Sequence, residues 1–165
     1  DPETVKPLSL LCHSISQISE FTRGVQSKAA FKLLKQTLPG PYTFILPASS
    51  SLPRIIIEHK EHKKSWKRKE IGVRIPKDDL VLEFLRLLDT PVLCSSVPAE
   101  RGGKQLATDS SQISDVWGDR VAFIVDAGIR NNEPSTVVDL TSEDEIKILR
   151  HGAGDVEIFS PYLKN

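Results

Sequence analysis

The sequence contains no methionine, only two cysteines and few aromatic residues, which make up 6% of its 165 residues. No stretch approaches the roughly 18 consecutive apolar residues of a membrane-spanning helix, so we expect no membrane role. Two cysteines are too few for a disulfide scaffold. Because Cys12 and Cys94 both lie in apolar runs, we expect reduced core residues of an intracellular, cytoplasmic protein, with a plastid or mitochondrion as the alternative compartment. A chain that begins with Asp1 and lacks methionine is expected to be part of a longer or processed protein.

The common catalytic sequence motifs are absent as well. The chain has no GxGxxG, no Walker loop, no HExxH, no CxxC pair and no GxSxG elbow. Its 22 basic and 22 acidic side chains balance, but residues 1–82 carry 14 basic and 8 acidic groups and residues 83–165 carry 8 and 14. The first half is therefore expected to face anions such as phosphates, unless a single basic loop produces the whole excess.

The sequence does contain an interleaved series of strand and helix patterns. Short apolar or β-branched runs predict strands, and serine or aspartate ahead of apolar residues at helical spacing predicts helices. Helices are expected at 14–23, at 27–38, from 78 or 79 onward, and from 108 or 109 to about 116. Strands are expected at 8–12, 42–46, 71–75, 92–95, 121–125, 135–140 and 146–149. This alternation predicts the α/β class.

One segment, residues 58–70, is too polar to be core. It carries six basic and three acidic side chains, His59, His62 and Trp66. We expect a basic surface loop, or alternatively a fraying extension of a helix. The two histidines could share a metal or could simply be solvated, as the surrounding cations favour. Trp66 could stack on a nucleic-acid base or could only attach the loop to the protein surface.

Polar residues at the ends of apolar strands are the candidate site. Arg74 lies in the apolar run IGVRI, where a cation needs either an internal carboxylate partner or an anionic ligand. Ser96 follows one strand and Ser135 opens another, so their hydroxyls could bind phosphate or could cap the chain. Arg150 precedes His-Gly-Ala-Gly, which suits either a phosphate or carboxylate clamp or a plain surface turn.

Several segments, taken together and in order, resemble the Sua5/YciO/YrdC family. They cover nearly the whole chain and are KPLSLL at 6–11, LPGPYTFIL at 38–46, GVRIP at 72–76, PVLCSS at 91–96, PSTVVDL at 134–140 and ILRHGAG at 148–154. The resemblance implies a twisted mixed sheet with flanking helices. It also implies that residues 1–165 are one domain that lacks its first strands.

The resemblance further implies an activity and roles for residues. The family joins L-threonine, bicarbonate and ATP into threonylcarbamoyl-AMP with release of pyrophosphate, for modification of adenosine 37 in tRNA, and Mg²⁺ accompanies the ATP. By this likeness Arg74 is the expected catalytic residue in the substrate pocket. The residues expected to bind nucleotide and phosphate are Lys6, Ser96, Ser135 and Arg150.

The sequence departs from the family pattern at two places. Leu38 replaces a tryptophan, and Val97-Pro98 replaces Ala-Asn after Ser96. The loss of the asparagine favours the YciO-type branch of the family. Proline offers no side-chain donor and no N–H to a phosphate. The alternative to a synthase is therefore a module that binds nucleotide or RNA, either tRNA or double-stranded RNA, with weak or no synthetase activity.

Overall fold

The computed structural model describes residues 8–23, 25, 27–53, 58–61, 64–67, 69–103, 105–130, 133–142 and 145–163. They divide into two compact units. The first comprises residues 1–94 and 134–165, and the second comprises residues 95–133. None of the described helices is long and apolar enough to cross a membrane.

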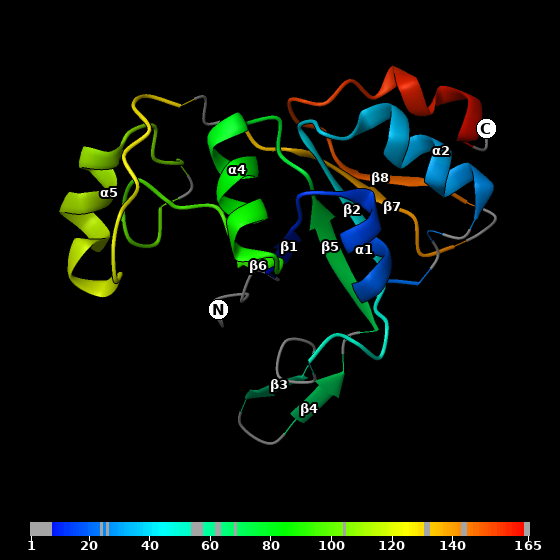
Figure 1. The fold of residues 1–165 in the computed structure, drawn as a ribbon, viewed down its shortest axis with the longest axis horizontal. Coiled ribbons are helices and arrows are strands. Elements are labelled where there is room, and N and C mark those ends of the chain that lie inside the picture. Colours follow the sequence, from blue (N-terminus) through cyan, green and yellow to red (C-terminus); the bar gives the residue numbers. More distant parts are fainter. Residues whose placement is uncertain are drawn as a thin grey trace. The chain divides into compact units, whose positions relative to one another are not determined.

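The first unit is built around a six-stranded sheet in the order β6-β1-β5-β2-β7-β8 (Figure 1). Its strands are β1 (Ser9–Leu11), β2 (Tyr42–Pro47), β5 (Glu70–Arg74), β6 (Val92–Cys94), β7 (Thr136–Asp139) and β8 (Lys147–Arg150). β1 runs parallel to β5 and β2 parallel to β7, whereas the other three pairs are antiparallel. The expected mixed α/β sheet is confirmed.

One face of this sheet forms the hydrophobic core. Side chains alternate between the two faces of a strand, so paired residues on neighbouring strands share a face. The core face consists of buried residues: Leu10, Tyr42, Phe44, Leu46, Ile71, Val73, Thr136 and Val138. Helical residues join the same core cluster, namely Ile18, Ala30, Leu33, Leu34, Leu82 and Phe159.

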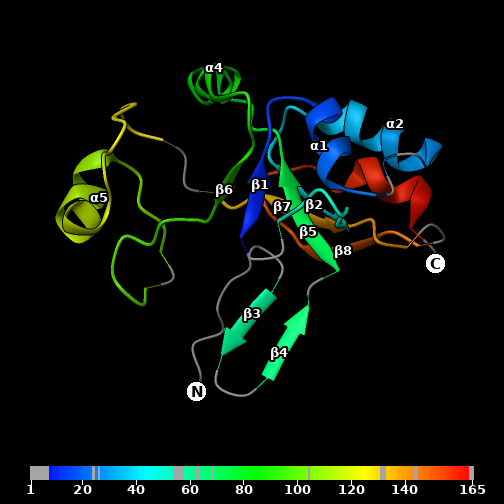
Figure 2. The same cartoon turned by 60° about the horizontal axis from the view of Figure 1, so that its bottom comes forward.

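The helices of the first unit are α1 (Ile15–Phe21), α2 (Lys28–Thr37), α4 (Asp79–Leu88) and the 3-10 segment η2 (Glu157–Tyr162). Figure 2 shows α1, α2 and the red C-terminal segment on the same side of the sheet. Ser14 caps α1 by accepting a hydrogen bond from the Gln17 N–H, and Asp78 caps α4 by accepting one from the Val81 N–H. Side-chain caps at these positions are the reason that the helix starts were predictable.

The basic segment contains a hairpin where a loop was expected. β3 (Glu58–Glu61) and β4 (Lys64–Lys67) pair in antiparallel register, with His59 opposite Trp66. Polarity argues against burial, but backbone N–H and C=O groups pair regardless of which side chains they carry. The expectation of a loop was therefore wrong for these eight residues.

The second unit contains α5 (Ser110–Trp117) and the short 3-10 segment η1 (Gly118–Arg120). The Trp117 indole N–H donates to the Pro98 carbonyl oxygen at 3.0 Å, which attaches α5 to the loop that precedes it. The strand expected at 121–125 is not present, since these residues have no strand partner in the described part of the chain. Phe123 is 69% exposed there, so an apolar run alone was a misleading signal.

Candidate functional site

The face of the sheet opposite the core carries the polar residues. Its members, here called the open face, are Ser9, Leu11, Thr43, Ile45, Pro47, Glu70, Gly72, Arg74, Val92, Cys94, Ser135, Val137, Asp139, Lys147 and Arg150. Many of them are only half-buried, including Ser9, Ile45 and Arg74. Alternation along the strands therefore separates the core residues from Arg74, and Ser135 and Arg150 lie on the same side as Arg74.

Arg74 ends β5 and has no carboxylate partner in the part of the chain that the structure describes. Its Nε atom is buried and makes no hydrogen bond, and no ion pair engages it among the described residues. Its guanidinium lies close to the thiol of Cys94. Burial raises the pKa of Cys94, and the nearby Arg74 guanidinium opposes that rise. Of the two alternatives for Arg74, an internal carboxylate or an anionic ligand, the first is not found among the described residues.

Ser135 and Arg150 are held together on the open face. Arg150 donates to the Ser135 carbonyl oxygen from Nε at 3.0 Å and from Nη2 at 2.7 Å, and Nη2 also reaches Ser135 Oγ at 3.1 Å. The Ser135 hydroxyl in turn hydrogen-bonds the hydroxyl of Thr43 at 2.7 Å. Ser135 is buried, whereas Arg150 is exposed. The serine thus fixes the position of a guanidinium that remains accessible to a ligand.

A β-bulge turns Arg150 toward this face. Val138 pairs with Ile148 and Asp139 with Lys147, but Val137 pairs with Arg150, so Leu149 is an extra residue in β8. Without it, Leu149 would stand opposite Val137 and Arg150 would point to the core side. Bulges commonly redirect a side chain next to a functional site. The extra residue therefore places a cation where regular alternation would place a leucine.

The His-Gly-Ala-Gly turn after Arg150 is fastened to the start of β7. The Thr136 hydroxyl donates to the Gly154 carbonyl oxygen at 2.7 Å and accepts from the Gly152 N–H at 3.1 Å. A β-carbon at Gly152 would collide with the carbonyl oxygen of Pro134. Gly152 is thus required by close approach of the backbone, and the turn is a rigid support for Arg150.

The Pro-Gly-Pro segment joins the ends of three strands. The Gly40 N–H donates to the Ile75 carbonyl oxygen at 3.0 Å, and the Thr136 N–H donates to the Pro41 carbonyl oxygen at 3.0 Å. The segment therefore connects the end of β5, which carries Arg74, to the start of β7, which follows Ser135. Three motifs that are far apart in the sequence meet at one end of the sheet.

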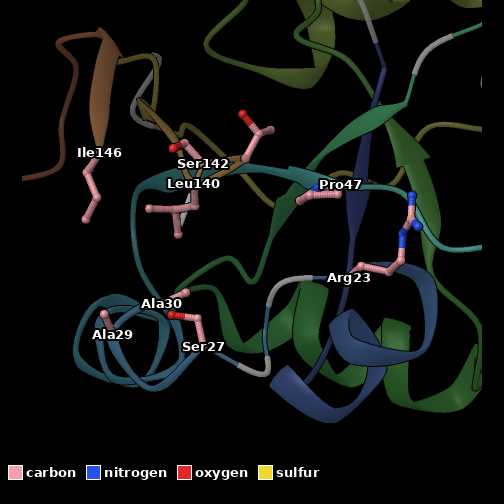
Figure 3. A pocket seen from close by; sticks show the side chains of 9 residues that line it. Arg23, Ser27, Ala29, Ala30, Pro47, Leu140, Ser142 and Ile146 are labelled. Atoms are coloured by element: carbon pink, nitrogen blue, oxygen red, sulfur yellow. The ribbon is translucent and has the colours of Figure 1, made fainter. Parts of the chain in front are cut away.

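A pocket of about 250 Å³ lies elsewhere (Figure 3). It is lined by Ser27, Ala29 and Ala30 at the first turn of α2, across from Leu140 and Ile146, and by Pro47 at the far end of β2 from Thr43. Its guanidinium, Arg23, is exposed and donates from Nε to the Ala48 carbonyl oxygen at 3.1 Å. Its lining mixes apolar groups with Arg23, Ser27, Thr141 and Ser142, and it contains none of the site residues expected from the sequence, so the open face is taken as the candidate site.

The open face, as defined by its residues above, leaves two of the expected site residues aside. Ser96 belongs to the second unit, where it is exposed. Lys6 lies outside the described residues. Both cysteines are free, as expected, and Cys12 is fully buried while Cys94 is half-buried.

Comparison of the sequence with protein families gives a match over most of the chain. The model of the domain named for Sua5, YciO and YrdC, described as telomere recombination, matches residues 3–152. The chain belongs to the Sua5/YciO/YrdC family. The resemblance seen in the ordered motifs is thereby confirmed.

Relatives within the family place the chain beside YciO. It is 32% identical over 151 residues to YciO of Escherichia coli, an uncharacterised protein, and covers 68% of it. An uncharacterised protein of Haemophilus influenzae is 35% identical, again with 68% covered. The crystal structure of E. coli YciO superposes with a TM-score of 0.79 at 31% identity, covering 94% of this chain and 69% of that one.

Synthases are more distant relatives. The threonylcarbamoyl-AMP synthase of Pyrococcus abyssi is 28% identical over 152 residues, which are 92% of this chain and 41% of that protein. The structure of P. abyssi Sua5 with L-threonine superposes with a TM-score of 0.80 at 26% identity, covering 95% of this chain and 43% of that one. The chain therefore spans about two thirds of its YciO relatives and less than half of this synthase.

Sequence reasoning missed two contributors to the site. Thr43 stands in the Pro-Gly-Pro-Tyr-Thr segment, at alternating spacing from the core residues Tyr42 and Phe44, and that spacing was a usable signal for the open face. The bulge at Leu149 left no signal, because its effect depends on the partner strand.

Proposed function

We propose that this protein takes part in the synthesis of threonylcarbamoyl-AMP from L-threonine, bicarbonate and ATP, for modification of adenosine 37 in tRNA. The observation that carries the proposal is Arg74, whose buried Nε has no partner on the open face. An unpaired, partly buried cation is costly unless something compensates it, and a polyphosphate or carboxylate would do so. Membership of a family that contains synthases supports the same reading.

The reaction needs alignment and charge neutralisation more than acid–base groups. The threonine amine and bicarbonate give a carbamate and water. A carbamate oxygen then attacks the α-phosphate of ATP, the bond between the α- and β-phosphates breaks, and pyrophosphate leaves with its electron pair. Negative charge gathers at the phosphates during this step. Hydrogen-bond donors that are already held in position toward that charge lower the activation barrier, because they do not have to reorganise during the reaction.

The residues of the open face fit these needs. Arg74 would neutralise the reacting phosphate or the carbamate. Arg150, held by three hydrogen bonds to Ser135, would bind the nucleotide phosphates without first having to order its side chain. Ser135 itself would orient Arg150 in the free protein, and a direct contact from Ser135 or Ser96 to the nucleotide stays a prediction.

Magnesium is proposed to arrive with the triphosphate. Mg²⁺ keeps several waters and binds substrate phosphates with the help of one or two carboxylates. The described residues contain no group of three or more side chains that could hold a metal by themselves. Asp139, a carboxylate of the open face, accepts hydrogen bonds from the Thr141 N–H at 2.8 Å and its hydroxyl at 2.7 Å. Asp139 would be a candidate to assist a magnesium ion that is bound mainly by the phosphates, while Arg74 and Arg150 would neutralise phosphate charge.

The test is pyrophosphate release from ATP by the full-length protein, with and without L-threonine and bicarbonate. We expect release that depends on both, and a loss of at least about tenfold in kcat/KM for Arg74→Ala and for Arg150→Ala. Arg86→Ala is the matched control, because Arg86 is an exposed arginine in the last turn of α4. Release that ignores threonine, or an Arg74→Ala protein as active as Arg86→Ala, would contradict the proposal.

A second function is favoured by two specific observations. Pro98 stands where the synthases of the family carry asparagine, and its carbonyl oxygen is used internally by Trp117. The hairpin of β3 and β4 belongs to a segment with six basic residues. A nucleotide- or RNA-binding protein without synthetase activity would have these features. It would bind double-stranded RNA or tRNA with an affinity that falls steeply with salt, while releasing no pyrophosphate.

A further inference from the structure

We propose that Thr43 is a positioning residue for Arg150, acting through Ser135, so that the Arg150 guanidinium is presented to an anion on the open face. The inference rests on the proposed function for the identity of that anion, a pyrophosphate-containing ligand. The orientation of Arg150 rests only on its hydrogen bonds to Ser135. Thr43 was not among the residues that the sequence marked.

The three residues form one chain of hydrogen bonds. Thr43 Oγ1 lies 2.7 Å from Ser135 Oγ, and Ser135 Oγ lies 3.1 Å from Arg150 Nη2. Thr43 is 6% and Ser135 7% exposed, so water does not compete for either hydroxyl. Among the described residues, Ser135 is the one hydrogen-bond partner of the Thr43 hydroxyl. Leaving a buried hydroxyl without its single partner costs free energy, so the Thr43 hydroxyl is expected to stay hydrogen-bonded to Ser135.

Packing selects the rotamer that makes this bond. A β-carbon placed on Gly72 would lie 3.3 Å from the Thr43 γ-methyl, so the methyl group faces β5. The hydroxyl faces the other neighbour of β2, where Ser135 precedes β7. β-Branched side chains have few χ1 choices, and here the two branches meet two different strands. The absence of a side chain at Gly72 thus leaves room for the Thr43 methyl group on one side, while the hydroxyl bonds Ser135 on the other.

The consequence lies at Arg150. Its Nε and Nη2 are occupied by Ser135, whereas Nη1 has no partner among the described residues. The guanidinium of an exposed residue would otherwise sample many orientations. Loss of the Thr43 hydroxyl would leave Ser135 Oγ free to rotate, and the Arg150 Nη2 contact would weaken with it. The anion would then have to order the arginine when it binds.

The experiment compares three variants of the full-length protein with pyrophosphate as the probe. Thr43→Val keeps the shape and removes the hydroxyl, and Thr43→Ser keeps the hydroxyl. Thr37→Val is the matched control, because Thr37 is also buried but its hydroxyl donates to the Leu33 carbonyl oxygen within α2. The readouts are pyrophosphate affinity by calorimetry and the exchange rate of the Arg150 Nε–H with water by NMR, assigned with Arg150→Lys.

We expect Thr43→Val to weaken pyrophosphate binding about fivefold, the worth of one ordinary hydrogen bond, and to speed Nε–H exchange, while Thr43→Ser and Thr37→Val stay within about twofold of wild type. If Thr43→Val behaves as Thr37→Val in both readouts, the inference is overturned. It is also overturned if Thr43→Ser fails as badly as Thr43→Val, since the methyl group would then be the cause. A wild-type protein that binds no pyrophosphate would refute the proposed function, and Nε–H exchange would still decide the role of Thr43.

Discussion

Gly154 lies directly against the ring of Tyr42. A β-carbon at position 154 would come within 2.7 Å of Cδ1 and Cζ of that ring. The ring cannot move aside easily, because Tyr42 stacks on Phe44 at 6.0 Å and meets Phe159 edge-on at 5.8 Å. The close contact thus joins the turn after Arg150 to the aromatic part of the core.

The Gly154→Ala variant should therefore be destabilised. We expect a loss of about 1–3 kcal/mol in the free energy of unfolding, the usual range for overpacking a filled core. Urea unfolding measures it. Gly118→Ala is the control, because the nearest atom to its added methyl would be Ser114 Oγ at 3.4 Å. Equal stability of the two variants would show that Tyr42 yields without cost.

Phe159 should be a main contributor to stability, whereas Phe123 should not. Phe159 is fully buried and contacts both Tyr42 and Phe44, while Phe123 is 69% exposed. We expect Phe159→Ala to cost about 3–5 kcal/mol, and Phe123→Ala to stay within about 0.5 kcal/mol of wild type. Chemical denaturation of both variants checks the contrast. A large loss for Phe123→Ala would mean that its segment is covered in the full-length protein.

Cys12 should make stability depend on alkaline pH. Burial raises its pKa from 9.0 to about 12, and the nearby Cys94 and Glu20 add to the rise. Between these two values the unfolded chain releases the thiol proton and the folded chain keeps it. The folded state then binds more protons, so the free energy of unfolding falls as pH rises, by about 1.4 kcal/mol per pH unit from this group. Below pH 9 the contribution is fully present.

The measurement is urea unfolding of the wild type and of Cys12→Ala at several pH values above the ordinary thiol pKa. The alanine variant should be less stable at neutral pH because of the cavity, but its stability should fall less steeply with pH. The difference between the two slopes isolates Cys12, since the other titrating groups are common to both proteins. Parallel curves would show that the thiol ionises in the folded state.

Arg74→Met should separate binding from folding. Methionine is shorter but keeps an unbranched apolar stem and leaves no unpartnered Nε in the sheet, so we expect stability to be unchanged or raised by about 1 kcal/mol. Binding of pyrophosphate should fall at least about tenfold. Arg86→Met is the control for the change of residue type. A loss of stability beyond about 2 kcal/mol would show that Arg74 serves the fold rather than a ligand.

Much of the fold could be predicted because its signals are local. The cap residues Ser14, Asp78 and Asp109 each bond a backbone N–H within three residues, and apolar runs mark the buried strands. The strand predicted at 121–125 was wrong, because a strand needs a partner strand and hydrophobicity alone does not supply one. For β3 and β4 the error was the opposite one: a loop was predicted, but the two strands pair with each other in spite of their polar side chains.

The candidate site was predictable only in part. Arg74 was marked by the cost of a charge inside an apolar run, and Arg150 by its position before a glycine-rich turn. Their common face could not be foreseen, since it depends on the bulge that Leu149 makes against β7. Thr43 acts through contacts to Ser135, 92 residues away, and local patterns carry no such information.

One face of the sheet carries the hydrophobic core and the other carries the candidate site, and this separation has a consequence for evolution. Along β2, Thr43 and Ile45 belong to the open face while Tyr42, Phe44 and Leu46 belong to the core, so substitutions at alternate positions act on separate properties. Ligand preference can drift through the open-face positions while the core positions preserve the architecture. Proteins of about 30% identity can therefore share this sheet and still have diverged in the molecule they recognise.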